Sequence, residues 1–142
     1  MTKRIAYLLI LTVLSFSFNS CGVMFGGSKY NGRISVEDHP KAKIYVNGEL
    51  AGTGTAVGSY KRKDPLVVEV QQDGCETQTQ TFDNTLRAGN FLLSAFSWGL
   101  LGIVIDIASG ASFKPNHASN PDIEKVNDKN FNFYINLYDC EE

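Results

Sequence analysis

The stretch AKIYVNGELAGT, residues 42–53, gives the clearest indication of the fold of this chain. Its first part, Ala42 to Val46, places β-branched and aromatic residues in a short run that is typical of a strand. Asn47-Gly48 follows, and both residues accept the positive φ of a type I′ turn, so this pair is the strongest short-range indicator of a β-hairpin. Glu49 to Thr53 then returns as the second strand. The stretch therefore predicts two antiparallel strands joined by a tight turn.

Further short strands flank this hairpin. Residues 33–37 alternate in polarity, and residues 38–41 predict a turn because Pro40 fixes φ and Asp38 can bond to neighbouring backbone. Residues 66–71 form an apolar strand that ends at a second turn. The segment 75–82 alternates threonine with polar residues, which is typical of a strand with one solvent-exposed face. We expect a mainly β (α+β) fold.

The same region resembles the PEGA module of bacterial surface and envelope proteins. The residues that match are the Pro40 to Ala42 turn, the strand and turn at 44–48, the Gly52-Thr53 return, and 68–74. PEGA proteins usually have Gly-Tyr where this chain has Gly74-Cys75. The resemblance implies a small PEGA-like β-sandwich that acts as a binding or spacing unit, and it implies neither catalytic residues nor a specific ligand.

The N-terminus has the order of a secretory signal. Basic residues at 3 and 4 precede an uncharged apolar run over 5–18, and the small residue Ser20 precedes Cys21. A cysteine at this place resembles the lipobox of bacterial lipoproteins, in which the cysteine is acylated and becomes the new N-terminus. A plain secretory signal with a coincidental cysteine is the alternative. An uncleaved span is disfavoured because a bilayer needs about 20 apolar residues.

These features divide the chain into a signal peptide (1–20), a lipidated glycine-rich tether (21–32) and a β domain (33–142). The resemblance implies lipidation of Cys21 and a location in the cell envelope, on the periplasmic face or the cell surface, with the membrane as partner. Acidic residues outnumber basic ones by 15 to 13, and loss of the basic residues at 3 and 4 widens that excess. Since no basic stripe is present, we expect no nucleic-acid partner.

Residues 88–111 change the composition sharply. The run 88–105 carries no charge, and Trp98-Gly99 interrupts its centre. We therefore expect an apolar helix or a helical hairpin, bent at this point and inserted before the last strand. Four residues would give a stripe for membrane contact or close helix packing, namely Gly99, Gly102, Asp106 and Gly110.

The C-terminal part closes the domain. Residues 112–130 are polar with two prolines, and we expect a loop there. Residues 130–139 alternate cleanly between apolar and polar side chains, which predicts a last strand that pairs back into the sheet. Cys75 and Cys140 each lie at a strand edge. A disulfide between them and two separate buried thiols both remain open.

Few residues suggest chemistry. His39 and His117 lie in predicted loops without the spacing of a zinc site, and we interpret them as solvated. Asp106 is the only charge in its apolar surroundings, and we expect it to cap a helix or bond a neighbour. The run Lys61-Arg62-Lys63 is interpreted as a solvated strand end. We expect no enzyme, no catalytic residue, no metal and no cofactor.

The sequence thus favours a lipid-anchored, non-enzymatic interaction or structural module of the cell envelope, whose further partners would be envelope proteins. One alternative is an integral membrane component inserted through residues 88–108. A second alternative is a glycan-binding module with an aromatic platform made of Tyr45, Tyr60, Tyr134 and Tyr138. Oligomeric state and ligand are left open.

Overall fold

The computed structural model describes residues 27–138 and 140, and the predicted signal peptide and Cys21 lie outside these residues. The fold is mainly β, as the sequence predicts. Its elements are β1 (Lys29–Val36), β2 (Lys43–Val46), β3 (Glu49–Thr53), β4 (Thr55–Lys61), β5 (Leu66–Gln71), β6 (Gln78–Phe82), β7 (Asn84–Leu86), α3 (Ala88–Ser109), β8 (Phe113–Pro115), β9 (Ile123–Lys125) and β10 (Asn130–Ile135).

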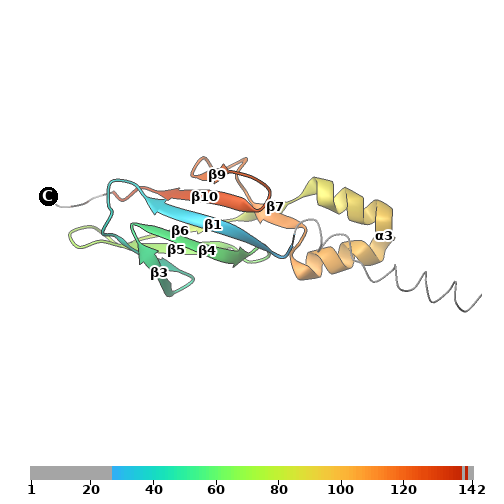
Figure 1. The fold of residues 1–142 in the computed structure, drawn as a ribbon, viewed down its shortest axis with the longest axis horizontal. Coiled ribbons are helices and arrows are strands. Elements are labelled where there is room, and N and C mark those ends of the chain that lie inside the picture. Colours follow the sequence, from blue (N-terminus) through green and yellow to red (C-terminus); the bar gives the residue numbers. More distant parts are fainter. Residues whose placement is uncertain (1–26, 139, 141–142) are drawn as a thin grey trace, which may run out of the picture.

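One sheet forms the body of the molecule, with strand order β6-β5-β2-β3-β4-β1-β10-β9 (Figure 1). Strands β3 and β4 are joined through Gly54 and share a single pair, Thr53 with Thr55. The sheet turns sharply there, so that its two halves face one another. Gly54 has a φ of 65°, and a Cβ built on it would lie 2.5 Å from the carbonyl oxygen of Pro40. Only glycine fits this corner.

The core lies between the two halves. The Phe82 ring from β6 meets the Phe133 ring from β10 at a centroid distance of 5.0 Å. The strands contribute inward residues at every second position, which is the period of a pleated strand. The buried cluster comprises Tyr30, Ile34, Val36, Ala42, Ile44, Val46, Ala56, Leu66, Val68, Val70, Phe82, Ile123, Phe131, Phe133 and Ile135.

The hairpin predicted from the central stretch is present. Asn47 and Gly48 both have positive φ, 51° and 86°, and they join β2 to β3. The predicted last strand is also present as β10, in which the side chains at 131, 133 and 135 are buried. Its partner is β1, to which it runs parallel, with Ile34 opposite Phe133. The last strand therefore closes the sheet beside the first.

Two predicted boundaries were wrong. The tether was expected to extend through Gly32, but β1 already begins at Lys29. Gly32 serves packing here, since a Cβ on it would lie 2.8 Å from the ring of Tyr60. The segment 112–130 was expected to be a loop, yet it contains β8 and β9. These strands have three residues each and pair with β7 and β10, respectively.

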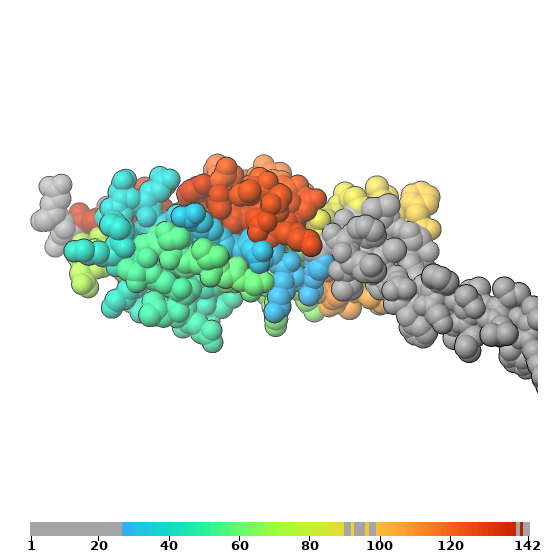
Figure 2. Space-filling view, in the orientation of Figure 1, coloured from blue at the N-terminus to red at the C-terminus, as the bar shows by residue number. Residues whose placement is uncertain are grey.

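Helix α3 forms a hairpin that projects from one end of the body (Figures 1 and 2). Gly99 has a φ of 60° and a ψ of −144°, so it breaks the helix next to Trp98, where the bend was predicted. The helix ends at Gly110, whose left-handed conformation directs its N–H to the carbonyl of Ile107. Such a glycine is a common helix terminator.

The base of the hairpin is closed by a second, two-stranded sheet. Strand β7 leads into α3 and β8 follows it, and Leu86 pairs with Phe113. Both ends of the hairpin therefore leave from one place on the body. Within the described residues, none of the helices combines the length and apolar character that crossing a membrane would need.

Candidate functional site

The exposed apolar residues gather on the helical hairpin. Phe96 is 89% exposed and Leu100 is 82% exposed, on either side of the break at Gly99. Ordinary soluble surfaces carry such side chains singly. Among the side chains that the structure describes between 86 and 107, the large exposed hydrophobic ones are Leu86, Leu92, Phe96, Leu100, Leu101, Val104, Ile105 and Ile107. We call these residues the apolar hairpin surface.

The opposite side of the second helical arm faces the protein. Asp106 is only 3% exposed, Gly110 is buried, and Gly102 is half-buried. A Cβ on Gly110 would lie 2.9 Å from Cβ of Lys63, so its lack of a side chain allows the close approach. The last part of the predicted stripe thus packs on the loop after β4. Gly99 differs, because it is exposed and forms the bend.

Arg62 ties the hairpin base to the sheet, and the expectation that it is solvated was wrong. It is fully buried, and its Nη2 donates to the carbonyl of Asp128 at 2.7 Å. Its Nη1 donates to the carbonyl of Phe113 at 3.4 Å, and the guanidinium lies 5.9 Å from the centre of the Tyr30 ring. Burial lowers the pKa of Arg62 to about 10. The alternation of β4 could have indicated that Arg62 is buried, since Lys61 and Lys63 on either side of it are both exposed.

The start of β1 lies at this same end. The N–H of Arg62 donates to the carbonyl of Ser28 at 2.9 Å, and the N–H of Asn31 donates to the carbonyl of Lys129 at 2.8 Å. In Figure 1 the start of β1, in blue, lies at the end of the body from which α3 projects. The described chain therefore begins beside the apolar hairpin surface.

Exposed lysines surround that place. Lys29 pairs with Lys61 across β1 and β4, so two cations stand side by side. Lys129 precedes β10 next to them, and Lys63 contacts Gly110 at the end of the hairpin. All four lysine side chains are exposed. We call these four residues the lysine collar.

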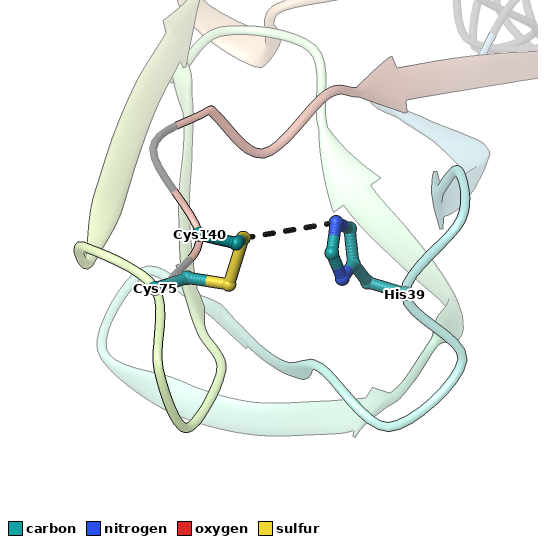
Figure 3. A group of neighbouring side chains, drawn as sticks. All are labelled: His39, Cys75 and Cys140. Atoms are coloured by element: carbon teal, nitrogen blue, oxygen red, sulfur yellow. Dashed lines mark hydrogen bonds between the residues drawn. A yellow bond between two sulfur atoms is a disulfide. The ribbon is translucent and has the colours of Figure 1, made fainter. Parts of the chain in front are cut away.

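A disulfide lies at the opposite end of the body. The sulfur atoms of Cys75 and Cys140 are 2.03 Å apart, and the two residues form an isolated antiparallel bridge (Figure 3). Nε2 of His39 lies 3.8 Å from Sγ of Cys140. His39 was expected to be solvated, and it is instead half-buried against the sulfur.

These three residues are the one group of potential metal ligands found among the residues that the structure describes. Metals bind thiolates, and a disulfide offers none. In the bonded form shown in Figure 3, the cluster is therefore a covalent link and not a metal site. His117 lies elsewhere, with Nδ1 3.2 Å from the carbonyl oxygen of Pro115.

The four candidate tyrosines do not share a face. Tyr60 packs against the core. Tyr45 lies on the outer face of β2, whereas Tyr134 lies on the outer face of β10, in the other half of the folded sheet. Tyr138 is 64% exposed beyond β10. The four side chains therefore do not line one common surface.

Tyr134 instead belongs to a polar network at the sheet edge. Its hydroxyl donates to Glu124 at 2.8 Å, and the Asn132 amide donates to the same carboxylate oxygen at 2.8 Å. These two hydrogen bonds lower the pKa of Glu124. Because β9 is an edge strand, its charged side chains also discourage pairing with another chain.

The described surface thus has two distinctive ends, one apolar and basic, the other held by a disulfide. Comparison with protein-family models, with curated proteins and with solved structures finds no match to this chain.

Proposed function

We propose that this protein is a bacterial envelope lipoprotein, in which a PEGA-like β-sandwich is held at a membrane surface through acylated Cys21. The body serves as a non-enzymatic interaction or structural module. The observation that carries the proposal is the convergence of two features at one end of the body: the start of β1 and the apolar hairpin surface.

The length of the tether supports this arrangement. Cys21 precedes Gly27, the first described residue, by a short glycine-containing segment. Even fully extended, this segment reaches only about 20 Å, at 3.3–3.6 Å per residue. Acyl chains on Cys21 would therefore enter a membrane close to the hairpin end of the body.

Two further observations agree with the proposal. The disulfide between Cys75 and Cys140 suits an oxidising compartment outside the cytoplasm. The turns on which the PEGA resemblance rests have the backbone that such turns need, since Gly48 and Gly74 both have positive φ. The folded sheet, with its core between two halves, supports the β-sandwich that the resemblance implies.

Metabolic labelling with a clickable fatty acid, followed by mass spectrometry of the mature N-terminus, tests the proposal. We expect label on the wild-type protein and a mature chain that begins at acylated Cys21. A Cys21→Ser variant should lose the label. A Cys75→Ser/Cys140→Ser variant is the matched control and should retain it. A mature chain that starts elsewhere, or an unmodified Cys21, would overturn the assignment.

A further inference from the structure

We propose that the helical hairpin is a second membrane contact: the apolar hairpin surface enters the boundary between headgroups and acyl chains, and the lysine collar binds anionic headgroups. This inference rests on the proposed function, because it takes the membrane to be the one in which acylated Cys21 is anchored. A second contact of this kind would fix the orientation of the anchored body relative to the membrane.

The apolar hairpin surface has the composition that such a contact requires. Its most exposed side chains, Phe96, Leu100 and Leu101, lie around the bend at Gly99, at the tip of the hairpin. Exposure of these side chains to water contributes no favourable free energy. At a bilayer, each methylene that becomes buried contributes about 0.8 kcal/mol to the free energy of binding. The tip is therefore the part that would enter first.

The geometry of the base suits shallow insertion from one side. Strands β7 and β8 pair at Leu86 and Phe113, so the chain enters and leaves the hairpin at one place. Beyond the hairpin, β10 rejoins the sheet beside β1. A hairpin that dips into one leaflet satisfies both constraints, and the body remains on a single side.

A bilayer is favoured as the occupant because of where the chain begins. Ser28 is hydrogen-bonded to Arg62, and Arg62 is hydrogen-bonded to Phe113 at the hairpin base. The short segment from Cys21 to Gly27 keeps the lipid within about 20 Å of this place. The hairpin thus cannot lie far from the acyl chains.

The charged side chains around the hairpin also favour a bilayer as its partner. Lys29, Lys61, Lys63 and Lys129 are exposed around the hairpin end. The nearby carboxylate of Asp128 is paired with Lys125 at 2.6 Å, which reduces its repulsion of an anionic surface. Each lysine near an anionic membrane contributes about 1 kcal/mol. An apolar tip inside a basic collar matches the order of acyl chains and headgroups in a leaflet.

The chain carries its own probe, since Trp98 is the only tryptophan and directly precedes Gly99. The mature protein, purified from cell membranes with whatever modification it carries, would be reconstituted into vesicles of zwitterionic and anionic phospholipid, with and without bromine on the acyl chains. We expect strong quenching of Trp98 by the brominated lipids and little quenching by aqueous iodide. Efficient iodide quenching would overturn the inference. So would shielding from both quenchers, because it would show that protein covers the hairpin.

Variants localise the contact. Leu100→Asp/Leu101→Asp changes two exposed side chains, so it leaves the core intact. We expect it to weaken the bromine quenching by roughly tenfold, since aspartate is strongly disfavoured in the apolar region. Val57→Asp is the matched control, because Val57 is 73% exposed, as Leu101 is, but lies on β4 of the body. Equal quenching in both variants would contradict the inference.

The same samples separate this inference from the proposed function. If Cys21 is acylated and the protein is in the vesicles while Trp98 is quenched by iodide, the anchor stands and the hairpin contact fails. If Cys21 is unmodified while Trp98 is quenched by bromine, the contact stands and the lipoprotein assignment fails. The lysine collar is tested by replacing Lys29, Lys61, Lys63 and Lys129 with glutamine. Bromine quenching should then lose its dependence on anionic lipid, and a retained dependence would refute the role of the collar.

Discussion

Removing the disulfide between Cys75 and Cys140 should destabilise the folded body by about 4 kcal/mol. The two cysteines are 65 residues apart in sequence. In the chain-entropy treatment, opening a loop of this length frees about 14 cal/mol/K in the unfolded chain, or about 4 kcal/mol at 25 °C. This is a large share of the 5–15 kcal/mol by which small domains are stable.

The perturbation is the double variant Cys75→Ser/Cys140→Ser, made in a fragment that spans residues 27–142, which contains the whole buried core cluster. Urea unfolding followed by circular dichroism in mild detergent gives the free energy of unfolding. We also expect a larger m-value, because the unlinked unfolded chain exposes more surface. Wild-type protein treated with a reductant should match the double variant, and the double variant should not respond to the reductant.

Equal free energies of unfolding for oxidised wild type and the double variant would show that the disulfide does not stabilise the body. A single variant Cys75→Ser that is clearly less stable than the double variant would also contradict the prediction, since the loss would then come from local packing and not from the opened loop.

Three other predictions concern the body. Gly54→Ala should lower the free energy of unfolding by clearly more than Gly48→Ala does. Gly48→Ala should cost about 1 kcal/mol, because both glycines have positive φ. Gly54→Ala should cost more, because only the Cβ at position 54 would meet Pro40. Equal losses in urea unfolding would contradict this. Arg62→Met should accelerate amide hydrogen exchange at 113, 114 and 126–130 by about tenfold, because it removes charged hydrogen bonds to two carbonyls. Lys61→Met, at an exposed site, should leave exchange unchanged. Burial raises the pKa of Tyr30 well above its ordinary value, so stability is full below about pH 10 and is lost above it, as the unfolded state deprotonates first. Tyr30→Phe should flatten this alkaline loss in urea titrations at several pH values, whereas Tyr138→Phe, at an exposed site, should not.

Local patterns predicted the elements that local chemistry determines. Asn47-Gly48 indicated a tight turn because these residue types tolerate positive φ, and both adopt it. The alternation over 130–137 indicated the last strand because one side of β10 is buried. The bend beside Trp98 was predictable, since Gly99 interrupts an apolar run and accepts the required backbone conformation.

The remaining features depend on partners that are distant in sequence. Strands β8 and β9 have three residues each, too few for a periodic pattern, and they exist because β7 and β10 pair with them. In the sequence, Gly32 resembles the glycines of a flexible tether. In the structure it lies in β1, where its lack of a side chain leaves room for the Tyr60 ring. The burial of Arg62 depends on carbonyls at 113 and 128. The proximity of His39 to Cys140 joins residues that are 101 positions apart in sequence.

The parallel pairing of β1 with β10 has a consequence for synthesis. The first strand of the body acquires this neighbour only when residues 130–135 have been made, so the half-sheet around β1 stays incomplete until then. A product truncated in the polar stretch before β10 would present the unpaired edge of β1 to other chains. Completion of the sheet therefore depends on β10, even though the determinants of the central hairpin come much earlier in the chain.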